Sequence, residues 1–329
     1  MTDPPARSGI FRTVLGDVRE LGRVNYHEHL FQRSPLLPGD ELDDEARSSA
    51  ELEILRTSGF NSMVDATPVG LGRQPEAVAR LAAARNVNVI ATTGRHRDAH
   101  YSDQPWVHEL NGDDWADLFL RELTVGVAAD DSEYGRNALG DVEPARSPGG
   151  DPIRAGILKA GIDYWAITRA ERAALEGVAA AHLVTGAPVM VHTEACSAAL
   201  EVLHLLATLG VPENRVVIAH ADRNPDPHLH AEIAEAGAYL GYDGAGRHRA
   251  WPDSVLLDSL AAVVDRGHTD RILLGADVAR ASRYRSYGGL PGLGYLGDRF
   301  VPRLGERIGA HLLDDILVGN PRQFLGWSS

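Results

Sequence analysis

The chain of 329 residues has a single cysteine, Cys196, so no internal disulfide can form and a reducing compartment is expected. No run of about 18 apolar residues is present, which excludes an ordinary membrane-spanning helix. Residues 1–8 are polar and contain prolines, and they lack the apolar centre of a secretory signal peptide. We therefore expect a cytoplasmic protein with no membrane partner.

The chain also has fewer basic than acidic residues. The chain has 32 basic and 46 acidic residues, which gives a net charge of −14 at pH 7. Such a surface repels a phosphate backbone on average, so we expect no nucleic-acid partner and predict a small-molecule substrate instead. Hydrophobic residues make up 44% and charged residues 24% of the chain, as in ordinary soluble globular proteins.

Short β-strand patterns alternate with helical patterns along most of the chain. Strands are expected near residues 24, 61, 88, 154, 189, 217, 239 and 272. Helices are expected over residues 43–58, 74–85, 115–125, 169–185, 198–209, 227–236 and 254–266, with further helices over 300–325. Eight such strands predict an α/β fold of the (β/α)8 TIM-barrel type. The alternative is an open doubly wound sheet, but no Gly-x-Gly-x-x-Gly motif follows the first strand.

The domain organisation is expected to be simple. We predict one barrel domain over residues 1–329, with a short strand and turn over residues 10–18 as an N-terminal extension. Residues 1–9 are expected to form a flexible tail, and residues 94–113 a polar loop. Residues 126–152 are rich in Gly, Asp, Pro and Ser, and they predict a long loop that is either a lid or a surface insertion.

Chemically reactive side chains stand where the predicted strands end. His27 and His29 are two residues apart, so on a strand they point to the same face. The fourth, fifth, sixth and eighth strands end in Lys159, His192, His220 and Asp277. Strand ends of a barrel meet at one mouth, so these side chains should converge there. Each alone is explained by a hydrogen bond to a neighbouring loop, but the whole set indicates a metal site.

These residues resemble the metal site of the phosphotriesterase family of the amidohydrolase superfamily. The resemblance covers nearly the whole chain and includes the segments Thr13-Val14-Leu15-Gly16, His27-Glu28-His29-Leu30, Val191-His192-Thr193, His220-Ala221-Asp222, Tyr284-x-x-Tyr287-Gly288-Gly289 and Asn320-Pro321. It implies a (β/α)8 barrel that binds two divalent metal ions. Zinc is the first expectation, and manganese, cobalt and iron accept the same ligand types. The resemblance also implies a homodimer.

The resemblance assigns a role to each ligand. His27, His29 and Asp277 would hold the more buried ion, and His192 and His220 the more exposed one. Lys159, carboxylated by CO₂ to N6-carboxylysine, would bridge the two ions. A hydroxide between the ions would attack the substrate, and Asp277 would act as the catalytic residue that transfers its proton. Cys196 is interpreted as a small packing residue rather than a nucleophile.

Loops after the third, seventh and eighth strands are expected to select the substrate. The candidate substrate-binding residues are His96, Tyr242, Arg249, Arg280 and Arg283. Arginine suits bidentate binding of a carboxylate or phosphate, so this group favours an anionic or highly oxygenated substrate. His96 stands where organophosphate hydrolases and quorum-lactone lactonases of the family place a bulky aromatic residue, which weakens the transfer of either activity.

The predicted function is a binuclear-metal-dependent lactonase that opens a sugar-type or otherwise anionic lactone. Hydrolysis of an organophosphate or an amide at the same site is the alternative among enzymes. A non-catalytic barrel that binds a small molecule is the alternative from another class. Metal content separates these classes, because a binding barrel has no need for a complete ligand set.

Overall fold

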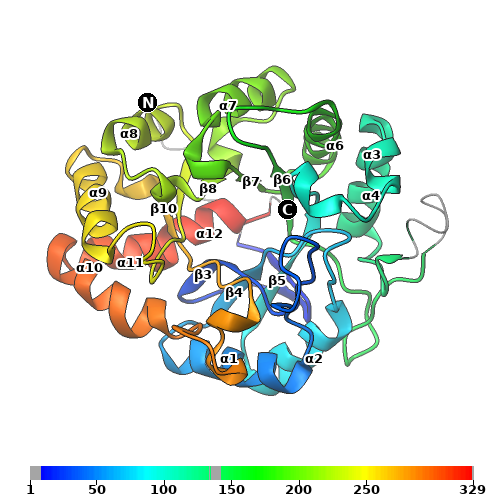
Figure 1. Ribbon diagram of the computed structural model, residues 1–329, viewed down its shortest axis with the longest axis horizontal. Helices are drawn as coiled ribbons and strands as arrows, with labels where there is room; N and C mark the ends of the chain where they lie inside the picture. The colour runs from blue at the N-terminus through cyan, green and yellow to red at the C-terminus, as the bar shows by residue number, and fades with distance from the viewer. Residues whose placement is uncertain (1–8, 133, 135–141, 328–329) are drawn as a thin grey trace.

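The computed structural model describes residues 9–132, 134 and 142–327, and within them the chain forms a barrel of eight parallel strands (Figure 1). The strands pair in chain order and are β3 (Val24–Glu28), β4 (Ser62–Asp65), β5 (Asn88–Gly94), β6 (Ile157–Gly161), β7 (Val189–His192), β8 (Val216–Ala219), β9 (Tyr239–Tyr242) and β10 (Ile272–Leu274). The ring closes between its ends, where the Asp277 backbone N–H donates to the His27 carbonyl at 3.0 Å. The predicted (β/α)8 fold is confirmed.

Helices surround the strands in a ring (Figure 1). They are α1 (Glu45–Thr57), α2 (Pro75–Arg85), α3 (Trp106–Glu109), α4 (Gly112–Thr124), α6 (Arg169–Thr185), α7 (Ala199–Thr208), α8 (Pro227–Glu235), α9 (Asp253–Asp265), α10 (Val301–Ile308), α11 (Ala310–Asp314) and α12 (Asn320–Leu325). Helix α6 has the predicted bounds because both ends carry strong signals. Thr168 and Glu171 form a capping box, and Gly186 adopts the left-handed conformation after the last turn.

The N-terminal extension is a hairpin of β1 (Phe11–Thr13) and β2 (Gly16–Val18), as predicted. Two other expectations need correction. The strand expected near residue 154 is β6, which starts only at Ile157, because Ile153 and Ala155 donate their backbone N–H groups to Ala145 and Glu122 outside the barrel. The expected loop over 94–113 contains a 3₁₀ turn, η1 (Asp98–Tyr101), and helix α3.

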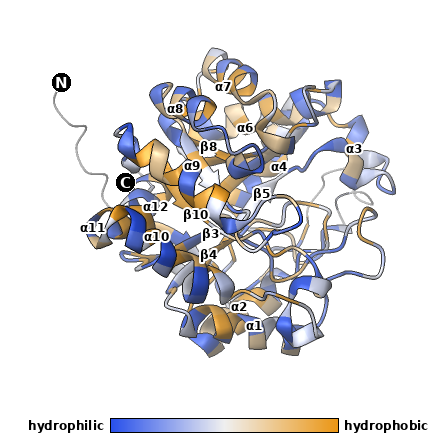
Figure 2. Ribbon diagram, turned by 60° about the vertical axis from the view of Figure 1, so that its left-hand side comes forward, coloured by the Kyte–Doolittle hydropathy of each residue, from blue (hydrophilic) through white to orange (hydrophobic). Residues whose placement is uncertain are grey.

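Side chains alternate between the inside and the outside of the barrel along β7, and this alternation places His192. On β7, Val189 and Val191 pack toward the helices, whereas Met190 belongs to the cluster inside the barrel. His192 follows Met190 by two residues and therefore shares the inward phase. Figure 2 shows the hydrophobic strands enclosed by helices whose outer faces are largely hydrophilic. The inner face of each strand is thus apolar in the barrel interior and polar at the C-terminal mouth.

The segment over 126–152 packs on the outside of the barrel where it is described. Val127 donates its backbone N–H to Ile153, Ala145 donates to Val127, and Ile153 donates to Ala145, so three short stretches of chain are linked beside α4. Tyr134 donates its hydroxyl to Glu122 on α4 at 2.7 Å. The centre of the segment and the expected tail over residues 1–8 lie outside the described residues.

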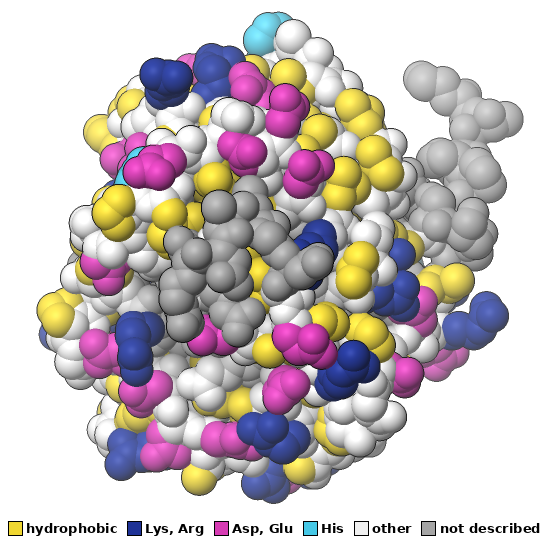
Figure 3. Space-filling model, turned by 90° about the vertical axis from the view of Figure 1, so that its right-hand side faces the viewer, with side chains coloured by type: hydrophobic (Ala, Val, Ile, Leu, Met, Phe, Trp, Pro, Cys, Tyr) yellow, Lys and Arg dark blue, Asp and Glu magenta, His cyan; other side chains and the backbone are white. Residues whose placement is uncertain are grey.

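Charge is not concentrated on the face of the molecule that carries α3 and α4 (Figure 3). Figure 3 shows acidic and basic side chains interspersed over the face that carries α3 and α4. Among the described residues, no helix combines the length and the apolar character that crossing a bilayer requires.

Candidate metal centre and active-site cavity

Five of the eight strands bring a candidate ligand to the same mouth of the barrel. His27 and His29 come from the end of β3, Lys159 from β6, His192 from β7, His220 from the residue after β8, and Asp277 from the loop after β10. All six side chains are buried, with at most 5% of any residue exposed, and all six line one cavity. The strand-end pattern therefore brings the predicted ligands together in space.

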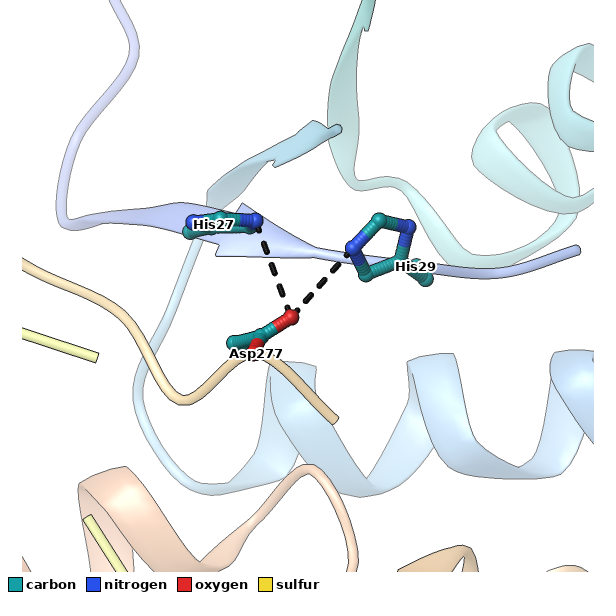
Figure 4. Close-up of side chains that lie close together, drawn as sticks. All are labelled: His27, His29 and Asp277. Carbon is teal, nitrogen blue, oxygen red and sulfur yellow. Dashed lines mark ion pairs between the residues drawn. The ribbon is translucent and has the colours of Figure 1, made fainter. Parts of the chain in front are cut away.

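The group expected to hold the more buried ion, here called the deeper group, consists of His27, His29 and Asp277 (Figure 4). Asp277 Oδ1 lies 3.7 Å from His27 Nε2 and 3.4 Å from His29 Nε2. The outer nitrogen of His29, Nδ1, contacts the Thr67 hydroxyl at 2.8 Å, so its Nε2 is left for a ligand at the centre. Burial lowers the pKa of His29 to about 3, which keeps the imidazole neutral, as a metal ligand must be.

The outer pair, His192 and His220, provides a direct test of whether a cation fits. Glu194 Oε1 lies 2.8 Å from His192 Nε2, and Asp243 Oδ1 lies 2.6 Å from His220 Nδ1. A carboxylate only accepts hydrogen bonds, so both of these nitrogens carry hydrogen. The remaining nitrogens, His192 Nδ1 and His220 Nε2, face each other at 2.7 Å, each with a lone pair when the rings are neutral.

Two facing lone pairs need a cation between them. A proton is a poor candidate, because burial lowers the pKa of His192 well below its usual value, and burial followed by the charge of Arg223 lowers the pKa of His220 to about 4. A divalent ion uses such a pair of neutral imidazoles as ligands. The chemistry of the donor set therefore fits a metal ion here.

Asp243 is the residue of this centre that the sequence analysis missed. Its carboxylate accepts from Tyr26 Oη, and it contacts His27 Nδ1 at 3.1 Å as well as His220 Nδ1. His27, His220 and Asp243 also form a compact group that could hold an ion among themselves. We interpret Asp243 as a partner of the ligands, because its bonds to both Nδ1 atoms leave both Nε2 atoms free for the centre.

Lys159 lines the same cavity as the two histidine groups and is the only lysine of the chain. Its ammonium group donates to the Ala66 carbonyl at 2.7 Å, and burial lowers its pKa to about 8. Gly94 on the neighbouring strand is required by this packing, because a Cβ there would overlap the Lys159 carbonyl. A buried amine beside metal ligands fits the bridging role that the resemblance implies.

A model of the family described as "Phosphotriesterase family" matches residues 9–325. The chain belongs to this family. It is 32% identical to a phospho-furanose lactonase of Mycoplasmopsis synoviae over 96% of this chain and 91% of that protein. The predicted resemblance is confirmed.

Solved structures give the same result. An amidohydrolase from Mycoplasma synoviae superposes with a TM-score of 0.88 at 30% identity, covering 98% of this chain and 93% of that one. A lactonase from Listeria monocytogenes superposes with a TM-score of 0.84 at 26% identity, covering 97% and 100%. The chain is a hydrolase, as predicted, and the alternative of a non-catalytic binding barrel is set aside.

In this phosphotriesterase-family hydrolase the ligands form the floor of a cavity of about 310 Å³. The walls are strongly cationic, with side chains of Arg97, Arg223, Arg247 and Arg280. Arg223 and Arg247 both pair with Asp277 Oδ2, Arg223 at 2.9 Å. Burial alone would raise the pKa of Asp277, but the charge of Arg247 outweighs it and holds the pKa well below its usual range.

The predicted substrate-binding residues divide into two groups. His96 and Arg280 line the cavity. Arg283 lies behind the wall, where its guanidinium donates to the Asp277 carbonyl at 3.0 Å, and Arg249 is exposed outside the cavity. Arg97, Arg223 and Arg247 take their place. Of the described residues over 126–152, none lines the cavity, so the expected lid receives no support from this part of the chain.

Tyr242 is placed away from the cavity for a clear physical reason. Tyr239 points into the barrel and Leu240 points out, so Tyr242 points out and Asp243 points in. The Tyr242 hydroxyl contacts His230 Nδ1 on α8 at 2.6 Å. Counting in steps of two from Tyr239 is the sequence signal that would have selected Asp243 instead.

Two ligands have an unusual backbone conformation. His220 has φ of 64° and Asp277 has φ of 45°, in the left-handed region that non-glycine residues seldom adopt. Each costs of order 1–3 kcal/mol and persists only where the surrounding structure holds it, a pattern that is concentrated at functional sites. The barrel thus stabilises these two side chains in positions that a relaxed strand end would not give.

Proposed function

We propose that this hydrolase opens a phosphorylated or otherwise anionic sugar lactone with two divalent metal ions. The observation that carries the proposal is the union of two features in one cavity: a floor of four imidazoles with Lys159 and Asp277, and a wall of four guanidinium groups. The similarity to a phospho-furanose lactonase supports the same class of substrate.

The candidate ligands would bind the two ions in two groups. His27, His29 and Asp277 would hold the deeper ion, and His192 and His220 the outer one, with Lys159 as an N6-carboxylysine between them. When bound, two such ions generate a hydroxide at neutral pH and polarise the lactone carbonyl. Zinc is the first choice for this set of nitrogen and carboxylate ligands.

The protein side chains position the substrate and move the proton. Arg97, Arg223, Arg247 and Arg280 can neutralise and orient the anionic group of the lactone. Asp277 lies between the ligand histidines and the arginines, where it can accept the proton from the attacking hydroxide. It then delivers the proton to the ring oxygen as the acyl C–O bond breaks, which leaves an open-chain hydroxy acid.

The arginine wall also separates this proposal from the alternative among enzymes. A neutral phosphotriester offers no negative charge to the four guanidinium groups of the cavity. The anionic group of a lactone can form charge-assisted hydrogen bonds with them. We therefore favour the lactone over a triester, and an amide with an anionic group is the second substrate class for this cavity.

A substrate panel tests the proposal. It contains γ-lactones of pentoses with and without a phosphate group, a neutral phosphotriester and an anionic N-acyl amide, each assayed with the zinc-loaded enzyme. We expect kcat/KM to be about 10-fold to 100-fold higher for the phosphorylated lactones, the size of one or two charge-assisted hydrogen bonds. A triester or an amide that is turned over faster than every lactone would overturn the proposal.

The bridge can be tested separately because the chain has one lysine. Protein loaded with metal in ¹³C-labelled bicarbonate should show one carbamate carbon signal by NMR. Lys159→Arg should remove the signal while the fold, followed by circular dichroism, is kept. A signal that persists in the variant would come from another amine and would contradict the assigned bridge.

A further inference from the structure

Each histidine of the centre has a partner on the nitrogen that faces away from it. Asp243 serves His27 and His220, and Thr67 serves His29. The corresponding partner of His192 is Glu194, whose Oε1 lies 2.8 Å from His192 Nε2. Asp243 is fully buried, whereas the Glu194 side chain is 29% exposed and lines the cavity. Among these hydrogen-bond partners, the Glu194 carboxylate of His192 is therefore the one that lines the cavity where a substrate would bind.

The local backbone keeps Glu194 in this position. Glu194 opens the 3₁₀ turn η2 (Glu194–Cys196) directly after β7, and its carbonyl accepts from the backbone N–H and the hydroxyl of Ser197, at 3.0 Å and 2.6 Å. Ala195 and Cys196 have φ of 52° and 56°, in the left-handed region. This conformation turns the chain sharply so that residue 194 faces back toward His192.

Arg97 holds the carboxylate from the other side. Its Nε lies 3.0 Å from the same oxygen, Glu194 Oε1, and its Nη1 lies 3.4 Å from Asp163 Oδ1. Arg97 also lines the cavity. Glu194 is thus held between a ligand histidine and a guanidinium of the substrate wall, and Asp163 anchors that guanidinium without touching the histidine.

We propose that Glu194 is a positioning residue for the outer metal ion. Its carboxylate fixes the imidazole of His192 with hydrogen on Nε2 and the lone pair of Nδ1 directed at His220. The inference rests on the metal centre of the proposed function. Outer partners of this kind contribute about 10-fold to 100-fold to metal affinity.

Metal titration of three variants tests the inference without any activity assay. The apoenzymes of wild type, Glu194→Ala, Glu194→Gln and Asp163→Asn are titrated with Zn²⁺ against a chromophoric chelator. In Glu194→Ala, we expect the affinity for one ion to fall about 10-fold to 100-fold while that for the other stays within about threefold. Glu194→Gln keeps an oxygen acceptor and should recover part of the loss. Asp163→Asn is the matched control and should bind both ions as the wild type does.

Cobalt spectra and thermal melts complete the test. The visible absorption of the Co²⁺-loaded protein should change in Glu194→Ala at the outer site alone, and unchanged melting of the apoprotein would show that the fold is intact. If the wild type binds two ions and Glu194→Ala binds both equally well, the role of Glu194 is wrong and the metal centre stands. If the wild type binds fewer than two, both proposals fail together.

Discussion

The two ends of this barrel both bury arginine side chains, but they pair them differently. At the N-terminal end, Arg215 is 2% exposed and donates to the backbone carbonyls of Gly186, Phe324 and Gly326 at 2.8–3.1 Å. At the C-terminal end, Arg223 and Arg247 pair with the carboxylate of Asp277, a candidate metal ligand. Arg215 is a structural link, because its partners are fixed, neutral backbone carbonyls. Arg223 and Arg247 line an open cavity, so they remain available to a substrate.

The N-terminal end is closed by packing as well. Phe324 and Leu325 of α12 join Tyr239, Val24 and Leu273 in the cluster inside the barrel. Figure 1 shows α12 across the middle of the ring. The difference between the ends teaches that burial alone does not identify a functional arginine; its partner and its access to a cavity do.

Removal of the Lys159 side chain should have the largest effect on metal binding and activity at the C-terminal end of the barrel. In Lys159→Ala, we expect metal content to fall from two ions per chain and kcat/KM to fall by more than about 10²-fold, because a bridging ligand matters more than an outer partner. Elemental analysis and lactone kinetics measure the two effects. Two retained ions would exclude a bridge at this position.

Asp243→Asn should weaken the binding of both metal ions. One carboxylate supports His27 of the deeper group and His220 of the outer pair, so about 10-fold to 100-fold lower affinity is expected at each site. The same chelator titration measures it. A loss confined to one ion would show that Asp243 supports only one of its two histidines.

Arg247→Ala should raise KM for a phosphorylated lactone by about 10-fold to 100-fold, since a hydrogen bond to a charged group contributes about 1.5–3 kcal/mol. KM for the same lactone without phosphate should change much less. Arg247→Lys is the control that retains the charge but loses the planar pair of donors. Equal changes for both lactones would mean that Arg247 acts through Asp277 rather than on the anion.

Arg215→Ala should act on stability instead. We expect the free energy of unfolding to fall by about 2–5 kcal/mol, because several buried carbonyls lose their donor. Urea unfolding measures this, and kcat of the folded enzyme should stay within about twofold. A variant that is stable but catalytically impaired would show that Arg215 is not a purely structural residue.

Arg249→Ala should have the smallest effect. The side chain is exposed and lies outside the cavity, so kinetics and stability should remain within about ±0.5 kcal/mol of the wild type. Parallel measurement of Arg280→Ala, which removes a cavity arginine, provides the contrast. A large KM effect at Arg249 would show that the loop after β9 closes over bound substrate.

The inward placement of two candidate ligands, Lys159 and His192, could be predicted from the sequence because the needed information is local. Met190 and His192 on β7, like Ile157 and Lys159 on β6, are two residues apart, and a strand keeps such residues on one face. The same rule, applied to β9, would have selected Asp243 instead of Tyr242. That error was avoidable from sequence.

The arginine wall was only partly predictable. The loops after the strands could be seen to be rich in arginine, but which guanidinium enters the cavity depends on contacts between distant segments. Arg283 and Arg280 are three residues apart, yet Arg280 lines the cavity and Arg283 bonds to a backbone carbonyl behind it. No periodic pattern exists in such a loop to decide between them.

The sequence by itself determined the eight-strand barrel and the residue types that end its strands, because propensity and alternation act over a few neighbouring residues. The tertiary structure alone decided that Asp243 supports His27 from 216 residues away, that Asp277 pairs with Arg223 and Arg247, and that Glu194 meets Arg97. Those contacts join separate strand-end loops, and only closure of the barrel brings the loops to one mouth.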